Sequence, residues 1–469
     1  MKYSIYIILV VACLSTGCSR DNFLDFEPKG QVIPTKVEEF RALLDQVEPD
    51  PNINFTKGFG THHDFTILAS DNYFLSEQVR ANFGISPEQI NMYLFRDQIS
   101  TDNGDDNTWI LYYNQIYVAN VVLEGLKTVE NGTQEEIAEL RADASLQRAF
   151  AYFNLINIYS VHYNPETANT DLGVPIRQGI DLEGSDFTRA SVQSVYDLIL
   201  SDINNSISAL PDLQPANLTF RPSKAGAYAF LARVLLFQGK YQEALNAANN
   251  GLNLKNTLRN INSDPTDPRD ANVIAFPLAL EDPQLIWFKD SGGFTIVSTP
   301  EFYGLYEDND LRKRWFADAN TYFFAPIDNP VFVAHRANNN TNVSITTSDL
   351  YLIRMECNTR LGNIPAANSD LNLLRSNRFE DGTYTPINIT NEDELLAFVK
   401  DEIRREKAPS VLRTFDIKRY NRFDDQKITV THTFEGETVV VQPNSLNWAL
   451  PIANNYIVAN PEIEQNPRQ

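Results

Sequence analysis

Helical periodicity that returns in pairs along the chain is the feature that most constrains the fold. Apolar side chains recur at three- and four-residue spacing from Trp109 to Val121, and again from Gln134 to Tyr159. The first of these helices should begin near Asp106. Asn120 lies on the apolar stripe of that helix, so we expect it to have a buried partner and to tie the helix to a neighbour.

The same periodicity predicts more helices downstream. Ser191 has a side chain typical of an N-cap, and the helix that follows it should end at Leu210-Pro211. Two further helices are expected, one before and one after Gly239. The segments with this pattern are 192–210, 221–252, 348–377 and 392–407.

Small residues occupy matching places in two of the predicted helical hairpins. Gly239 is followed five residues later by Ala244, and Gly362 is followed five residues later by Ala367. Small residues where paired helices cross are typical of tetratricopeptide-like units. The sequence therefore predicts a mostly α fold, in which a scaffold of helical pairs is interrupted by long irregular insertions.

The expected insertions cover residues 50–108 and 254–346, where Asn, Asp, Pro and Gly break the helical pattern. A small β-hairpin is expected near the C-terminus. Its strands would be Lys427–Phe434 and Glu437–Gln442, joined by a turn at Glu435-Gly436.

The N-terminus has the pattern of an export signal. Lys2 precedes an apolar run, Ser4–Leu14, that is too short to span a membrane. Small residues then lead to Cys18, so residues 1–17 are predicted to be a lipoprotein signal peptide and Cys18 the acylated first residue of the mature chain. The junction departs from the usual lipobox, which has Leu where Ser15 stands. Two alternatives are acylation of Cys13 and an ordinary secretory signal.

The cysteine count agrees with an acylated N-terminus. After processing, Cys357 would be the remaining thiol, so no internal disulfide could form. Its place in a helical pattern predicts a small buried residue and not a nucleophile.

Composition excludes some partners. Asp and Glu outnumber Lys and Arg by 61 to 39, which gives a formal net charge of −22. Phosphate contacts need a basic face, so we expect no nucleic acid partner.

Several stretches resemble SusD/RagB-family lipoproteins of Gram-negative glycan and peptide uptake systems, in family order and over nearly the whole chain. The stretches are Cys18-Ser19 with Phe23-Leu24-Asp25, Trp109–Asn120, Arg148–Phe153, Thr188–Ala190, Lys224–Ala244, Tyr351–Glu356, Gly362–Arg375, Arg404–Glu406, Phe415–Arg419 and Asn460–Pro467. The chain departs from the family at residues 407–414, so contacts of that loop are not carried over.

The resemblance implies one SusD-like domain, residues 18–469, with an N-terminal part at about 22–215 and a C-terminal part at about 220–469. It implies a lipoprotein held at the outer membrane through Cys18 and facing the cell exterior. It also implies a nutrient-binding function without catalysis, and a SusC-type TonB-dependent transporter as partner for a glycan or peptide ligand.

No motif for nucleotide binding, zinc proteolysis or serine hydrolysis occurs, and no cofactor is expected. His62-His63-Asp64 is predicted to be solvated or capping and not a metal site. The oxygen-rich run Thr101–Asn107 could bind calcium, but it lacks the closing Glu and precedes a helix, so capping is favoured. Arg404-Arg405-Glu406 is expected to form a structural ion network.

Long loops on a rigid scaffold are where binding residues gather, so we place the ligand site on the insertions at about 50–108 and 270–330. Aromatic rings there could stack on sugars, with polar side chains binding the hydroxyls. The candidates are Asn72, Tyr73, Phe74, Tyr93, Phe95, Arg96, Phe302, Tyr303, Tyr306 and Trp315. The alternative for each ring is packing of the insertion.

Two other functions stay open from the sequence. A surface glycan hydrolase would need two opposed carboxylates, which the 61 acidic residues could supply. A structural tetratricopeptide adaptor would bind another protein instead of a nutrient. A turnover assay on candidate glycans would separate the hydrolase from nutrient binding. A pull-down that returns a barrel transporter would favour nutrient binding over the adaptor.

Overall fold

The computed structural model describes residues 34–45, 49–50, 55–56, 59–100, 104–181, 185–291, 295–334, 341–408 and 412–468. The elements below belong to the compact unit Lys36–Gln469. The predicted signal peptide and Cys18 lie outside the described residues.

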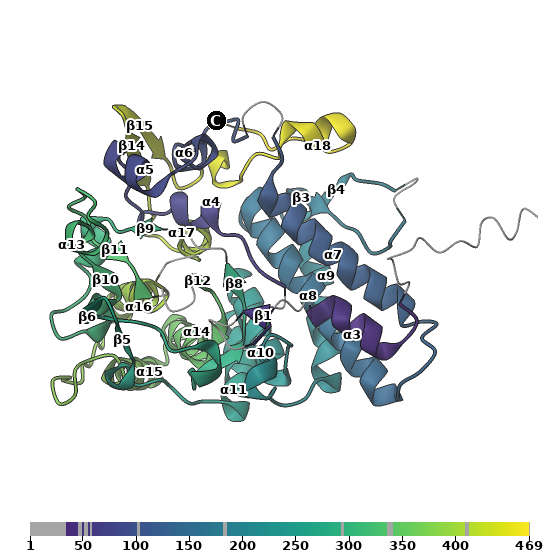
Figure 1. Cartoon of the computed structure of the whole chain (residues 1–469), viewed down its shortest axis with the longest axis horizontal. Coiled ribbons are helices and arrows are strands. Elements are labelled where there is room, and N and C mark those ends of the chain that lie inside the picture. Colours follow the sequence, from purple (N-terminus) through teal and green to yellow (C-terminus); the bar gives the residue numbers. More distant parts are fainter. Residues whose placement is uncertain are drawn as a thin grey trace, which may run out of the picture. The chain divides into compact units, whose positions relative to one another are not determined.

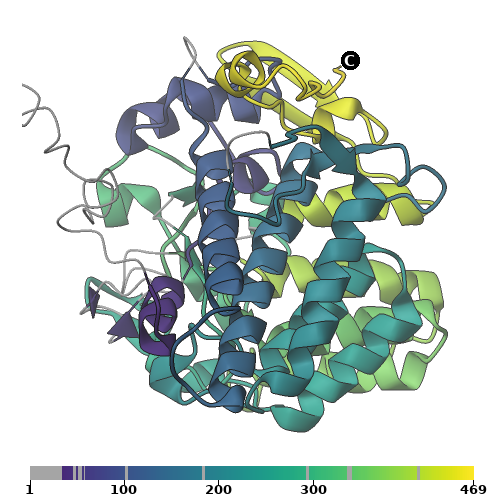
Figure 2. The same cartoon turned by 90° about the vertical axis from the view of Figure 1, so that its right-hand side faces the viewer.

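Paired helices form the scaffold (Figure 1, Figure 2). Neighbours in the sequence pack together, and α11 packs on α14 to join the two halves of the stack. This confirms the expected mostly α, tetratricopeptide-like architecture. The scaffold helices are α7 (Asn107–Gly125), α8 (Gln134–Tyr159), α9 (Val192–Ser206), α10 (Lys224–Phe237), α11 (Tyr241–Leu254), α14 (Thr347–Arg360), α15 (Ile364–Ser376) and α16 (Glu392–Glu406).

Side-chain caps explain where several of these helices begin. The Asp106 carboxylate accepts hydrogen bonds from the backbone N–H groups of Thr108 and Trp109, at 2.9 and 3.2 Å. Ser191 caps α9, as predicted, and Thr133 forms a capping box with Glu136. Each cap satisfies donors that a helix start would otherwise leave without partners.

The predicted tie at Asn120 is present. Arg148 of α8 donates to Asn120 Oδ1 at 2.8 Å, and Asn120 Nδ2 donates to the carbonyl of Arg177 at 2.9 Å. Arg148 also forms a buried ion pair with Asp202 of α9, 2.7 Å long. A single polar chain therefore links the helices α7, α8 and α9.

The turn between α10 and α11 requires glycine. Gly239 has φ +72°, and a Cβ there would lie 3.0 Å from the Phe423 ring. The small residues that follow the two predicted hairpin turns, Ala244 and Ala367, are fully buried, as expected where helices cross. Cys357 is buried as well.

The insertions contain more structure than the sequence predicted. The segment 50–108, expected to be irregular, forms three short helices, and a further one precedes it. The short helices of the chain are α3 (Val37–Asp45), α4 (Asp64–Leu68), α5 (Glu77–Phe83), α6 (Pro87–Tyr93), α12 (Pro300–Tyr303), α13 (Ala319–Phe323), α17 (Arg413–Phe423) and α18 (Asn454–Ala459). Turns of 3₁₀-helix lie at Ile207–Ala209, Ala216–Leu218, Ile261–Ser263, Ala279–Glu281, Leu311–Trp315 and Leu446–Trp448.

The strands are short and antiparallel, in small separate sheets. They are β1 (Pro49–Asp50), β2 (Phe55–Thr56), β3 (Leu172–Pro175), β4 (Arg189–Ser191), β5 (Thr266–Asp267), β6 (Asp270–Ile274), β7 (Leu285–Trp287), β8 (Asp290–Ser291), β9 (Ile296–Val297), β10 (Phe316–Ala317), β11 (Val331–Phe332), β12 (Thr341–Asn342), β13 (Ile345–Thr346), β14 (Val430–Phe434) and β15 (Glu437–Val441). The pair β14–β15 confirms the predicted hairpin, with Glu435 and Gly436 at positive φ in its turn.

Buried ion pairs connect the C-terminal helices. Glu402 of α16 pairs with Arg312, Arg375 and Arg405, and Glu406 pairs with Arg378 at 2.6 Å. These contacts confirm the predicted structural ion network for Arg405 and Glu406, and Arg404 pairs separately with Asp71 at 3.5 Å.

Residues 407–414, where the chain departs from the family pattern, are held by ion pairs at both ends. Residues 409–411 lie outside the described part. Lys407 pairs with Asp349 of α14 at 2.6 Å, and Arg413, the first residue of α17, pairs with Asp71 at 2.7 Å. This segment therefore connects the helical scaffold to the first insertion.

Candidate functional site

A polar hollow of about 390 Å³ opens where α4, α6 and α7 begin. It lies within the first insertion, one of the two regions predicted to carry the ligand site. Its walls are His62, Asp64, Ser86, Glu88, Gln89, Met92, Ile99, Ser100, Gly104, Asp105, Asp106, Asn107 and Thr108.

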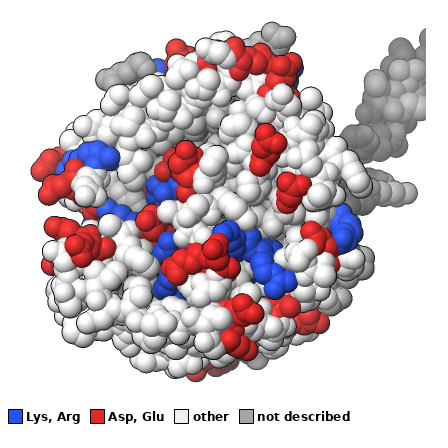
Figure 3. Space-filling model, turned by 90° about the vertical axis from the view of Figure 1, so that its left-hand side faces the viewer, with Lys and Arg blue, Asp and Glu red and all other residues white. Residues whose placement is uncertain are grey.

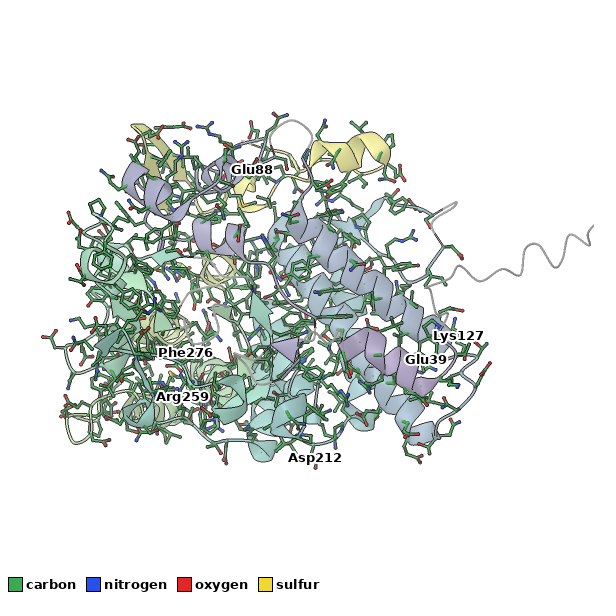
Figure 4. The ribbon with its side chains drawn as sticks, viewed as in Figure 1. Glu39, Glu88, Lys127, Asp212, Arg259 and Phe276 are labelled. Atoms are coloured by element: carbon green, nitrogen blue, oxygen red, sulfur yellow. The ribbon has the colours of Figure 1, made fainter. Side chains whose placement is uncertain are left out.

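Helix starts position the lining residues. Ser86 and Gln89 form the capping box of α6, and Gln89 Nε2 also donates to Asp64 Oδ2 at 2.8 Å. Glu88, which Figure 4 labels, belongs to the first turn of α6. Acidic side chains at helix N-termini are stabilised by the helix dipoles, which explains why carboxylates gather at this place.

Histidine and aspartate side chains order the inner wall. His62 Nδ1 lies 2.7 Å from the Thr108 hydroxyl, and His62 Nε2 lies 3.7 Å from Asp64. The Tyr159 hydroxyl donates to Asp106 at 2.6 Å, and burial raises the pKa of that carboxyl. His63 is buried at the N-cap position of α4, without a side-chain cap hydrogen bond, and burial lowers its pKa to about 3. Of the two expected roles, solvated or capping, it is therefore not the solvated one.

The hollow offers groups that bind hydroxyls and amides. Carboxylates, amides and hydroxyls line it, together with the apolar Met92 and Ile99. Such groups can donate to and accept from a polar ligand. Among the described residues, no cluster of three or more His, Cys, Asp or Glu side chains is arranged to hold a metal ion.

Most predicted aromatic residues of the first insertion are buried. Tyr93 stacks on His432 of β14 with ring centroids 4.0 Å apart, and Phe95 packs edge-on against Trp448 at 5.6 Å. Tyr73 packs edge-on against Tyr93, while Phe74 is half-buried. These rings fix the insertion to the C-terminal hairpin, which is the packing alternative stated for them.

The two polar candidates of the first insertion also contact the protein itself. Asn72 Oδ1 accepts a 2.6 Å hydrogen bond from Arg404. Arg96 is exposed and pairs with Glu437 of β15 at 2.5 Å. Neither residue lines the hollow.

The candidates of the second insertion form a separate aromatic cluster. Phe302, Tyr303 and Tyr306 pack around Phe316, with ring centroids 5.5 to 6.0 Å apart. Trp315 is buried against Phe276 at 5.1 Å. Tyr303 is only half-buried, so it is the ring in this cluster that a ligand could reach.

The hollow instead joins two motifs that the sequence analysis considered as metal sites and assigned to solvated or capping residues. His62 and Asp64 come from the first motif, and Asp105–Asn107 from the second. Asp106 caps α7, as the capping prediction required. Two polar segments about forty residues apart, neither with helical or strand periodicity, are the sequence feature that could have indicated the hollow.

Charges of both signs occur together on the face in Figure 3, where Lys and Arg lie among Asp and Glu. No helix in the described part of the chain is long and apolar enough for a bilayer crossing.

The structure is a tetratricopeptide-like scaffold with a polar hollow on its first insertion. A family model described as starch-binding and associating with the outer membrane, SusD-like, matches residues 22–236. A second model, described as the SusD family, matches residues 331–468. The chain belongs to the SusD family.

Relatives and solved structures agree with this membership. The chain is 24% identical over 471 residues to "SusD-like protein P38" of Formosa agariphila, covering 85% of both proteins. It is 23% identical over 238 residues to a "SusD-like protein" of Bacteroides ovatus, covering 50% of this chain and 39% of the relative.

The solved structures extend the similarity to the fold. A SusD superfamily protein from Bacteroides thetaiotaomicron aligns with a TM-score of 0.70 and 18% identity, over 92% of this chain and 100% of that one. A "putative sugar binding protein" from Bacteroides vulgatus aligns at 0.67 and 20%, over 93% and 99%. At these identities the structures establish the fold alone.

Proposed function

We propose that the protein is a cell-surface binding lipoprotein that captures a glycan or peptide in the polar hollow and delivers it to a SusC-type TonB-dependent transporter. The observation that carries this proposal is the hollow itself, which presents polar side chains at the junction of three short insertion segments on a rigid scaffold. Membership of a family whose model is described as starch-binding supports a glycan as ligand.

Binding without catalysis fits the carboxylates of the hollow. Asp106 accepts hydrogen bonds from two backbone N–H groups and from Tyr159, and Asp64 accepts one from Gln89. Two of the four carboxylates that line the hollow, Asp64 and Asp106, therefore have structural roles at helix starts. A glycan hydrolase would instead need one carboxyl group to protonate the leaving oxygen and another to attack or activate water.

Removing polar groups from the hollow should weaken binding. We expect Asn107→Ala and Glu88→Ala each to lower affinity about threefold to tenfold, because a hydrogen bond contributes on the order of 0.5–1.5 kcal/mol. Affinity would be measured by calorimetry on the oligosaccharide or peptide that an array screen returns. Asp212→Ala is the matched control, since Figure 4 places Asp212 at the opposite end of the molecule from Glu88.

Two results would contradict the hollow as the ligand site. One is unchanged affinity in both variants while the fold is intact. The other is that Asp212→Ala weakens binding as much as they do. Release of shortened oligosaccharides by the parent protein would support the hydrolase alternative instead.

The membrane attachment is proposed to be acylation of Cys18. Each buried methylene contributes about 0.8 kcal/mol, so several acyl chains make an anchor durable. We expect Cys18→Ala to move the protein from the membrane fraction to the medium or periplasm, as followed by immunoblot. If Cys13→Ala is released and Cys18→Ala stays bound, Cys13 is the anchor.

A further inference from the structure

A second cavity, of about 210 Å³, lies beside the start of α7 and is apolar where the hollow is polar. We call it the aromatic groove. Trp109, Tyr113 and Tyr117 of α7 line one side, Phe187 lies on the loop before β4, and Tyr456 comes from α18. Figure 1 shows α7, β4 and α18 at the same end of the molecule.

Several polar groups in the groove already form hydrogen bonds within the protein. Asn120 Nδ2 donates to the carbonyls of Arg177 and Gly179, and the Tyr113 hydroxyl donates to the carbonyl of Pro175 at 2.8 Å. The Arg177 guanidinium lies 4.8 Å from the Phe187 ring centroid and donates to the carbonyl of Asp181. A sugar needs partners for its hydroxyls, so this groove suits an apolar occupant better than a glycan.

Exposed apolar side chains extend the groove over the surface. Tyr117 is 45% exposed, Ile110 43% and Ile180 36%. Ile110 and Tyr117 are seven residues apart on α7 and so lie on neighbouring parts of one helix face. Contiguous exposed apolar surface with aromatic and arginine side chains is typical of protein–protein contact sites.

The charges next to the groove are acidic. Asp186 and Glu462 are exposed and adjoin the lining residues Phe187 and Ile463 in the sequence, and exposed Asp181 lies two positions after Gly179. Arg177 is held by Phe187 and Asp181, as described above. A partner that brings basic side chains would therefore be attracted, and one that brings acidic side chains would be repelled.

We propose that the aromatic groove docks a segment of a partner protein that presents one bulky apolar side chain flanked by Lys or Arg. The size agrees, because a cavity of about 150 Å³ can hold a benzene molecule, and the groove is larger than that. A buried apolar anchor surrounded by weaker contacts is the usual arrangement of a binding hot spot.

The groove and the hollow share a wall. The Asp106 backbone N–H donates to the Tyr456 hydroxyl at 3.1 Å, and Asn455 Nδ2 donates to Asp105 at 2.9 Å. A partner bound in the groove would thus sit beside the ligand in the hollow. The proposed docking of a partner in the aromatic groove does not depend on the proposed function. Only a role of that partner in ligand delivery rests on the proposed function.

Photo-crosslinking in cells that make the full chain tests the docking site. With p-benzoylphenylalanine in place of Tyr117, we expect a covalent adduct to one protein, mapped by mass spectrometry to a segment with a bulky apolar residue and Lys or Arg within a few positions. The matched control carries the crosslinker in place of Leu373 of α15, which is 43% exposed, close to the 45% of Tyr117. We expect no such adduct there.

Any of three crosslinking results would overturn the proposal. They are equal adducts from both positions, an adduct segment without a bulky apolar residue, and adducts to glycan or lipid alone. Absence of any adduct, in protein shown by surface labelling to be displayed, would overturn it as well.

Purified protein gives a second measurement. Fluorescence anisotropy with the labelled peptides Lys-Lys-Gly-Phe-Gly-Lys-Lys and Glu-Glu-Gly-Phe-Gly-Glu-Glu should show at least tenfold tighter binding of the basic peptide. Tyr117→Lys, which removes the ring and repels a basic peptide, should abolish that binding, whereas Asn107→Ala in the hollow should retain it. A parent protein that binds the basic peptide but no oligosaccharide on the array would count against glycan capture in the hollow and not against the groove. Equal affinity for the two peptides would contradict the docking proposal.

Discussion

Replacing Glu402 by alanine is expected to lower the free energy of unfolding by about 3–5 kcal/mol, the cost of removing one partner from a buried ion pair. Glu402 is fully buried in α16 and faces three guanidinium groups. Its carboxylate lies 2.8 Å from Arg312, 2.9 Å from Arg375 and 2.7 Å from Arg405.

The expected cost is large because the three arginines cannot leave the interior. Burial alone would raise the pKa of Glu402, but the neighbouring guanidinium groups of Arg312, Arg405 and Arg375 hold it well below its usual range. The carboxylate is therefore charged in the folded protein. Without it, like charges would face each other where solvent cannot screen them.

Asp401 provides a matched control on the same helix. Its side chain is 43% exposed and lies 3.8 Å from Arg404, so Asp401→Ala should change stability by no more than about 0.5 kcal/mol. Thermal and urea unfolding of both variants, followed by circular dichroism, would measure the difference. Equal stability of Glu402→Ala and Asp401→Ala would show that the arginines find other partners.

The scaffold could be predicted from the sequence because its helices bury one side against a neighbour. The helix predicted for Gln134–Tyr159 has those bounds, and the cap at Ser191 begins α9 as expected. Local rules suffice where spacing, capping and packing agree.

Helix α17 was missed for the opposite reason. Its buried residues include Arg413, Asp416, Lys418 and Arg419, which give no apolar stripe. Their partners come from distant parts of the chain, such as Glu356 for Arg419 at 2.5 Å and the carbonyl of Ser160 for Lys418 at 2.7 Å. A helix whose buried side is charged can be predicted only when those partners are known.

The polar hollow lies on one of the two predicted insertions, but none of the predicted candidate residues lines it. Aromatic rings in a long insertion serve first to bury the insertion, as Tyr93 and Phe95 do against His432. The hollow is lined by short polar residues whose proximity depends on tertiary structure. Asp64 and Asn107 line the same cavity although 43 positions separate them, and no local pattern encodes that.

Stability should depend on pH in two opposing ways, which a titration of the unfolding free energy can separate. Groups of the first kind stabilise the folded protein at low pH because folding raises their pKa. Asp264 is one of them, since burial raises its pKa to about 6. In the folded state it binds a proton that the unfolded chain releases above its usual pKa near 3.8. Its contribution is full below that value and is lost as the pH rises through about 6.

Groups of the second kind stabilise the folded protein at higher pH because folding lowers their pKa. Glu356 and Asp349 are two of them. Burial opposes their ionisation, but Arg419 and Arg360 hold the pKa of Glu356 at about 2, and Lys407 and Arg233 hold that of Asp349 at about 2. Their ordinary values are 4.5 and 3.8. Their contributions are therefore present above those values and are lost as the pH falls toward 2.

We expect the free energy of unfolding to change little or to rise slightly as the pH falls from about 6 to 4, and to fall steeply below that. In the lower range the unfolded chain takes up two protons that folded Glu356 and Asp349 do not, a slope of up to about 2.7 kcal/mol per pH unit. Glu356→Gln and Asp349→Asn should each flatten this acid slope, although both lower stability at pH 7. Glu392→Gln, at an exposed position on α16, is the control and should keep the parent slope. A parent slope that survives both substitutions would mean that other carboxylates cause the acid sensitivity.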